Sequence, residues 1–350
     1  MRTSACLGLA LVCIGTAVTA LRAAAPWPDS ASISGPKVIA GAPSAPTDAM
    51  RRPKAFILHL DPATRVAKLR LQDDGTLVDV VVLPHAEFPR HASTGEIGDY
   101  APLDHVIVRL HEDRRGEWRL ATYLKDDLSH QHGHGQTWRV DAIERSSGRI
   151  DYTVLGKGGE RETGFFYIDH ATRFWRKAQL AEFGGLRVGD GLRVKTRGVA
   201  EADLDRSGAD PARGFATQIA TDVMLDDASL EEVFRRPQSE LHARREREKG
   251  LASYVDEIAG RRLKVTVFRS FADTAGSLPI GTKLQVVPAE WDLQPEGAAV
   301  TATLVEVVPQ RKEPGFVLDV DEMRPGFLIG RTARIRIRDQ VAATPNMSKD

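Results

Sequence analysis

Short runs of apolar residues separated by turn residues fill most of the chain. Within many runs, apolar and polar positions alternate, which is typical of strands with one face in a core and the other in solvent. The alternation is clear in 186–196, where one predicted face carries Leu186, Val188, Leu192 and Val194. The pattern predicts an all-β protein.

The runs recur three times in a similar order, which indicates internal repetition. Each repeat contains a run that follows a turn with Pro or Gly, and a second apolar run that closes the repeat after a polar loop. We therefore expect three small, five-stranded, OB-like barrels in series, because a closed barrel has no exposed edge strand. The first runs are 101–110, 186–196 and 278–288, and the closing runs are 117–128, 214–225 and 299–309.

These repeats define the expected domains. The segment before them is rich in Ala, Pro, Ser and Gly, lacks an apolar period, and is expected to be a flexible tether. The boundaries are 26–53 for the tether, 54–135, 136–227 and 251–338 for the barrel modules, and 339–350 for a disordered tail.

A polar, charged helix is expected between the second and third modules, over 228–250. Ser229 and Glu232 have the spacing of a capping box. Pro237 suits the first position of a second helix, and Gly250 suits its end. Because acids and bases are interleaved on nearly every face, we expect either a solvated linker or a spacer packed by one edge.

The first 25 residues are typical of a secretory signal peptide. Arg2 supplies a positive start, residues 5–21 are apolar and uncharged, and Val18, Thr19 and Ala20 offer the small residues of a cleavage site. The alternative is an uncleaved anchor, although a bilayer span takes about 20 apolar residues. We expect an exported protein, periplasmic or extracellular, that contacts the membrane only if this segment stays attached.

Cysteine usage and charge narrow the chemistry further. Cys6 and Cys13 both lie in the signal segment, so the mature chain would have no disulfide, thiolate metal site or thiol nucleophile. Lys and Arg together number 48, as do Asp and Glu, and the formal net charge is zero. A chain without net charge has no long-range electrostatic attraction for nucleic acid. We therefore exclude nucleic acid as a partner.

Four motifs of the second module occur in order along 136–227: Val140 to Ile143, Asp169 to Thr172, Leu186 to Val194, and Ala216 to Ile219. In this order the module resembles the OB-like barrel domains of unknown function that occur in bacterial exported proteins. The resemblance implies a small barrel and an envelope location. It implies no catalytic residues.

His130, His132 and His134 stand at every second position of a His-Gln-His-Gly-His-Gly run. In an extended segment, alternate side chains point the same way, and neutral imidazoles suit Zn or Cu. Asp126 and Asp127 lie just upstream and could complete the site. The alternative is a polar junction between the first two modules.

A second candidate metal site is a loop of the second module. Asp203, Asp205 and Ser207 fall at alternate positions of a calcium-binding pattern, followed by Gly208. The bidentate acid that should close the cage is replaced by Gly214. The alternative is an ordinary polar hairpin loop.

The second module carries several aromatic residues, and OB-like barrels can bind single-stranded nucleic acid by stacking its bases on such side chains. Phe165 and Tyr167 would share one strand face, however, and we expect that pair to lie in the core. Export and zero net charge also argue against nucleic acid.

Enzyme signatures are weak. His111 and Glu112 begin a zincin motif, but Arg115 occupies the position of its second histidine. The expected function is therefore a non-enzymatic binding or scaffold protein of the envelope that contacts a protein or polymer through barrel surfaces. The alternatives are a metal-handling protein that uses the three histidines, and a hydrolase with dispersed acids, which a deep cleft lined by two carboxylates would favour.

Overall fold

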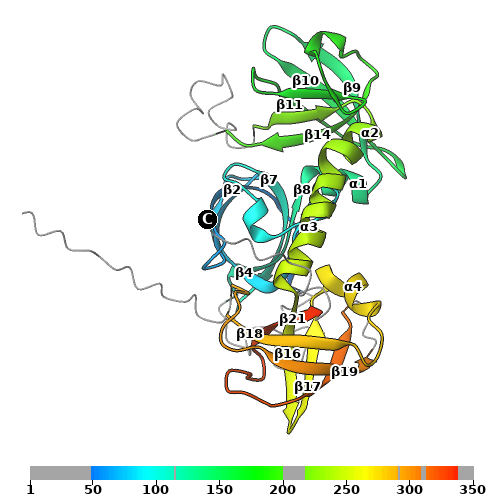
Figure 1. Cartoon of the computed structure of the whole chain (residues 1–350). Coiled ribbons are helices and arrows are strands. Elements are labelled where there is room, and N and C mark those ends of the chain that lie inside the picture. Colours follow the sequence, from blue (N-terminus) through cyan, green and yellow to red (C-terminus); the bar gives the residue numbers. More distant parts are fainter. Residues whose placement is uncertain (1–48, 114–115, 200–216, 291, 309–312, 338–350) are drawn as a thin grey trace, which may run out of the picture.

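The structure, a computed structural model, describes residues 49–113, 116–199, 217–290, 292–308 and 313–337. It consists of three closed β-barrels and a helical segment (Figure 1), so the all-β expectation is confirmed. The signal segment, the tail and the calcium-loop residues Asp203, Asp205 and Ser207 lie outside the described residues. Within the described ranges, no helix combines the length and apolar character needed to cross a bilayer.

The first barrel closes in the order β2, β3, β4, β8, β7 and back to β2. Its neighbouring strands are antiparallel except β4 and β8, which run parallel. Ile57, Leu69 and Val108 are among the residues of its core. The strands are β2 (Lys54–Asp61), β3 (Val66–Leu71), β4 (Leu77–Glu87), β7 (His105–Glu112) and β8 (Trp118–Asp126).

The end of the predicted tether belongs to this barrel. Residues Met50–Arg51 form β1, which pairs with β7. The guanidinium carbon of Arg51 lies 4.1 Å from the ring centroid of Trp118, so a cation–π contact holds the strand in place. The expectation of a flexible segment up to residue 53 is therefore wrong for its last residues.

The second barrel repeats the strand order of the first, with β11 and β15 as its parallel pair. A hairpin of two short strands, β12 and β13, extends the sheet from β15. Both barrels are OB-like in this five-strand closure. The strands are β9 (Thr137–Glu144), β10 (Arg149–Gly156), β11 (Gly159–Tyr167), β12 (Arg173–Arg176), β13 (Gln179–Ala181), β14 (Gly191–Arg197) and β15 (Ile219–Met224).

The buried strand face predicted for residues 186–194 is only partly correct. Leu186, Leu192 and Val194 are buried, but Val188 is 64% exposed. The strand β14 begins only at Gly191, and the preceding residues form a turn in which Asp190 N donates to Arg187 O. Strand alternation therefore does not apply to Val188.

The third barrel differs from the expected five strands: it has six, all antiparallel, in the order β16, β17, β20, β19, β18, β21. Two strands, rather than three, precede the pair β18 and β19. Two later strands close the barrel. The strands are β16 (Leu251–Ala259), β17 (Arg262–Val267), β18 (Lys283–Ala289), β19 (Val300–Val308), β20 (Gly315–Val320) and β21 (Thr332–Ile337).

Short elements connect the strands. They are β5 (Pro89–Arg90), β6 (Ser93–Thr94), η2 (Ile97–Asp99), α1 (Asp127–Gly133), η3 (Phe183–Gly185), η7 (Arg269–Phe271) and α4 (Ala272–Gly276).

The segment between the second and third barrels is one continuous helix, made of α2 (Asp227–Ser229), a π-helical stretch η6 (Leu230–Arg235) and α3 (Arg236–Lys249). The N-cap is Asp226, whose side chain accepts from Ser229 N, so the expected capping box at Ser229 is wrong. Pro237 lies inside the helix just after the π stretch. Proline has no backbone N–H to donate, and its ring crowds the preceding helical turn. The wider π turn before Pro237 provides room for the ring.

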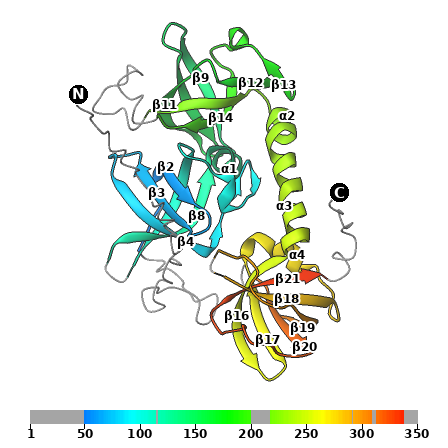
Figure 2. The ribbon, with the colours of Figure 1, turned by 60° about the vertical axis from the view of Figure 1, so that its left-hand side comes forward.

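The barrels are not arranged in space in their sequence order. The first barrel lies between the second and the third, and the helix runs beside it from one to the other (Figures 1 and 2). At a rise of 1.5 Å per residue, the helix is about 34 Å long, enough to pass a small barrel. Of the two expected alternatives, the spacer packed along one edge is the one the structure has: α3 packs against β6 and β21, while most of its other side chains are half-buried or exposed.

Candidate functional site

A pocket of about 290 Å³ lies where the first barrel, α3 and the third barrel meet. Its walls come from the β2–β3 turn, the end of β4, the segment around η2, the end of α3, η7, the β18–β19 loop and β21. The charged residues that line it are Arg65, Arg245, Lys249 and Arg334, against Glu96 and Asp292. Basic groups therefore outnumber acidic ones around the pocket.

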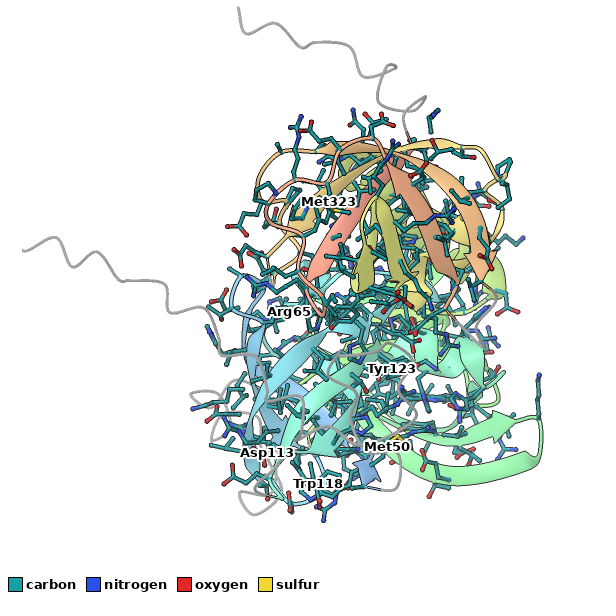
Figure 3. The ribbon with its side chains drawn as sticks, turned by 90° about the horizontal axis from the view of Figure 1, so that it is seen from below. Met50, Arg65, Asp113, Trp118, Tyr123 and Met323 are labelled. Atoms are coloured by element: carbon teal, nitrogen blue, oxygen red, sulfur yellow. The ribbon has the colours of Figure 1, made fainter. Side chains whose placement is uncertain are left out.

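Arg65 occupies the turn between β2 and β3 with a positive φ of 56°. Its guanidinium donates from Nε to Val82 O at 2.8 Å and from Nη2 to Leu83 O at 2.7 Å. The residue is only 2% exposed, and burial lowers its pKa to about 10, so it stays protonated at neutral pH. Figure 3 shows Arg65 at the boundary of the first and third barrels, whereas Trp118 lies toward the far end of the first.

Arg334 brings a second buried guanidinium from the third barrel. It is 5% exposed, and it donates from Nε to Leu293 O at 3.0 Å and from Nη1 to Gly250 O at 3.2 Å. Burial lowers its pKa to about 10 as well. Like Arg65, it is held by backbone carbonyl groups.

The segment around η2 and the end of α3 form a third wall. Arg245 donates to both carboxylate oxygens of Asp99 at 2.7 Å, and Lys249 donates to Glu96 Oε2 at 2.7 Å. Burial alone would raise the pKa of Asp99, but the hydrogen bonds from Arg245 and from Glu96 N outweigh it and lower that pKa. These ion pairs fix the helix against the first barrel.

Apolar side chains cover much of the rest of the pocket. Phe88 and Ile97 come from the first barrel, and Phe268 and Phe271 from the third, and all are buried. The pocket therefore combines basic groups with an apolar wall, which is typical of sites for small organic molecules.

The three histidines of the predicted metal site lie in and directly after a helix, not in a strand. Asp126 caps α1 by accepting from Ser129 N, and His134 is the C-cap residue. His130 and His134, four residues apart, therefore bring their rings together, with centroids 4.3 Å apart and planes tilted by 40°. The strand interpretation is wrong, and the described part of the chain contains no group of three or more His, Cys, Asp or Glu side chains that could hold a metal.

The polar side chains of α1 join the first two barrels. Asp127 accepts from His105 Nδ1 at 2.6 Å and, through its other oxygen, from Thr196 N and Thr196 Oγ1. Burial would raise the pKa of Asp127, but the charge and hydrogen bond of His105 and the bonds from Thr196 lower it. His105 Nε2 lies near the side-chain amides of Gln72 and Gln218. In a catalytic triad a nucleophile would occupy this position, so the His–Asp pair here links the two barrels instead.

Phe165, which is exposed, and Tyr167, which is half-buried, lie side by side on the outer face of the second barrel. The expectation that Phe165 and Tyr167 lie in the core is wrong: Phe166 is fully buried, whereas Phe165 is 44% exposed. Inside the barrel, Phe166 packs near Tyr152, with ring centroids 5.8 Å apart. Outside it, the Arg149 guanidinium lies 4.2 Å from the Phe165 ring centroid.

The pocket residues could not be found from the sequence. Arg65 and Arg334 come from opposite ends of the described chain and belong to no motif. Only the docking of the third barrel against the first brings their surroundings together.

Neither family models nor curated proteins nor solved structures match this chain.

Proposed function

We propose that this chain is an exported, non-enzymatic binding protein that takes up a small ligand in the pocket between its first and third barrels. The observation that supports it is a pocket bounded by both barrels and α3, with an apolar wall and buried guanidinium groups. The three barrels act as the scaffold that positions these walls. The proposed export rests on the signal-like first residues.

The resemblance of the second module to OB-like domains of bacterial exported proteins remains part of this proposal. Its five-strand closure with one parallel pair supports it. An envelope location would suit a protein that collects a ligand outside the cytoplasm.

The hydrolase alternative has one point in its favour, because Glu96 and Asp292 both line the pocket. Glu96, however, is held by Lys249 at 2.7 Å, which favours a fixed acceptor over a proton donor. Asp256 is an acid suited to proton transfer, since burial raises its pKa to about 6, but it does not line the pocket. Binding is therefore the better-supported function.

A pocket-blocking variant tests the proposal. A Cβ added at Gly98, which lines the pocket, meets no atom within 4 Å, so Gly98→Phe can be introduced without a clash at its first carbon. Gly184 in η3 of the second barrel has the same free space and also lies in a short 3-10 helix, so Gly184→Phe is a matched control.

The measurement is the melting temperature of the full chain with a panel of small carboxylates, amides, amines and sugars. We expect at least one compound to raise the melting temperature of the wild type and of Gly184→Phe but not of Gly98→Phe, because a ligand that binds only the folded state stabilises it. A panel without any pocket-dependent stabilisation contradicts the proposal.

A second candidate function is supported by the exposed aromatic face of the second barrel. Phe165, Tyr167 and Arg149 form a surface on which a polysaccharide could stack, with Phe165 and Tyr167 ring centroids 5.8 Å apart. Affinity electrophoresis in polysaccharide gels tests this: Phe165→Ser should lose retardation, whereas Leu180→Ser, at another exposed apolar residue of the same barrel, should keep it.

A further inference from the structure

From the charges around the pocket, and resting on the proposed binding function, we infer that the ligand is a small carboxylic acid with an apolar body, bound through Arg65 and Arg334.

The two guanidinium groups are buried without a carboxylate partner. Each donates its hydrogen bonds to backbone carbonyl oxygens, and within the described residues neither has an acidic oxygen within 4.0 Å. This differs from Arg90, which is similarly buried but pairs with Asp104 at 2.8 Å. Buried charges in proteins are normally paired, so two guanidinium groups without a carboxylate at a pocket indicate a negatively charged ligand.

The positive charge cannot be removed by loss of a proton at neutral pH. Burial lowers the pKa of both arginines only to about 10. The positive charge of Arg334 also lowers the pKa of Arg65, and both residues line the same pocket. One anion bound in the pocket would compensate the positive charge of both arginines.

The acidic residues nearby neutralise this charge only in part. Glu96 and Asp292 influence both arginines, but Glu96 is already bound by Lys249 at 2.7 Å. Of the four basic groups that line the pocket, Arg245 is paired with Asp99 and Lys249 with Glu96. Arg65 and Arg334 then remain against Asp292, and this excess of positive charge favours an anion over a neutral or cationic ligand.

The form of the pocket selects the class of anion. The side chains of Phe88, Phe268 and Phe271 provide an apolar wall, which an inorganic ion would leave uncovered. The volume of about 290 Å³ is at the lower end of ligand pockets and fits a small molecule. The planar fork of an arginine matches a carboxylate group.

Calorimetry on the full chain with matched probes tests this. Phenylacetate, phenylacetamide and 2-phenylethylamine share one apolar body and differ in charge, and phenyl phosphate and inorganic phosphate provide the other anion class. We expect phenylacetate to bind at least tenfold more tightly than the amide and the amine. Tighter binding of either phosphate compound would overturn the carboxylate assignment.

Variants locate the charge effect. Arg334→Met should weaken phenylacetate binding at least tenfold and leave weak amide binding unchanged, since a charge-assisted hydrogen bond is lost only for the anion. Its melting temperature without ligand should fall only modestly, because the loss of the hydrogen bonds to Leu293 O and Gly250 O is offset in part by removal of a buried charge. Arg262→Met, at an exposed arginine of the same barrel, is the control and should bind as the wild type.

The outcomes separate this inference from the proposed function. If the amide binds as tightly as the carboxylate, and both are lost in Gly98→Phe, the pocket is a ligand site but the anion inference is wrong. If no probe binds while another compound of the panel stabilises the wild type but not Gly98→Phe, the carboxylate inference alone is wrong. If binding is unchanged in both Gly98→Phe and Arg334→Met, both proposals are wrong. If Arg334→Met fails to fold, Arg334→Lys provides the test, since it keeps the charge but loses the planar fork, and unchanged phenylacetate affinity in it would contradict the assigned role of the fork.

Discussion

The hydroxyl of Tyr254 in the third barrel lies 3.3 Å from Nδ1 of His85 in the first. Tyr254 is fully buried, and the two rings have centroids 6.0 Å apart. Close by, Arg269 of the third barrel pairs with Glu87 of the first at 3.0 Å. The two barrels therefore meet through specific polar contacts beside the candidate pocket, and these contacts set its shape.

The contact of His85 predicts a pH dependence of stability. Burial and the charge of Arg65 lower the pKa of His85 to about 4, from 6.5 for a free histidine. The unfolded chain therefore takes up this proton more readily, and stability is lost as the pH falls from about 6.5 to about 4. The loss assigned to His85 is at most about 3 kcal/mol.

Urea unfolding between pH 7 and pH 4 measures this dependence. His85→Gln should reduce the change in the free energy of unfolding with pH. His59→Gln, at an exposed histidine, should leave that change as it is in the wild type. Equal slopes in the wild type and His85→Gln would contradict the assignment.

A second prediction concerns the docking of α3. Arg245 and Asp99 form a two-bonded ion pair at 2.7 Å, with exposed side-chain fractions of 19% and 11%. We expect a double-mutant cycle with Arg245→Met and Asp99→Asn to give a coupling of about 1–3 kcal/mol, as for hydrogen bonds between charged groups. The pair Arg244 and Glu248 on the same helix is the comparison.

That second pair is 4.0 Å apart and more than half exposed on both sides. Its coupling should stay below about 0.5 kcal/mol, the value of exposed helix pairs. Similar couplings for the two pairs would show that α3 is not held by Asp99.

A third prediction concerns the junction of the first two barrels. Asp127 is buried and accepts from His105 and from both groups of Thr196. We expect Asp127→Ala to lower the free energy of unfolding by about 3 kcal/mol, because it leaves these donors without their acceptor. Asp141→Ala, at an exposed acid of the second barrel, should cost much less, and chemical denaturation compares the two.

A fourth prediction concerns metal binding. His130 and His134 lie with their rings together at the end of α1, and among the described residues no three His, Cys, Asp or Glu side chains converge on a metal position. We expect titration with Zn or Cu to show only weak binding, changed little by alanine in place of His130, His132 and His134. Stoichiometric micromolar binding that disappears in this variant would restore the metal-handling alternative.

The sequence by itself determined the strands, the barrel class and the position of the helical segment. Alternation along a strand depends on neighbours in the chain, so it can be read locally, and so can the glycine that ends a helix at Gly250. The six strands of the third barrel were not predicted, because the sixth strand, β21, is distinguished only by its pairing with β16 and β18.

Local pattern failed where the result depended on partners elsewhere in the fold. Strand alternation places Phe165 and Tyr167 on one face and Phe166 on the other, but does not tell which face is buried. In the structure Phe166 is the buried residue, and it packs near Tyr152 of the neighbouring strand. The histidine run alternates like a strand, but Asp126 caps a helix there, and Asp127 and Gln131 bind β14.

The tertiary structure alone decided the arrangement of the barrels and with it the candidate pocket. The helix runs along one side of the first barrel to reach the third, so the first barrel lies in the middle. Arg65 and Arg334 then line one pocket although each is an isolated residue in its own segment. Charge compensation acts through space, and a linear sequence does not record which charges will be buried together.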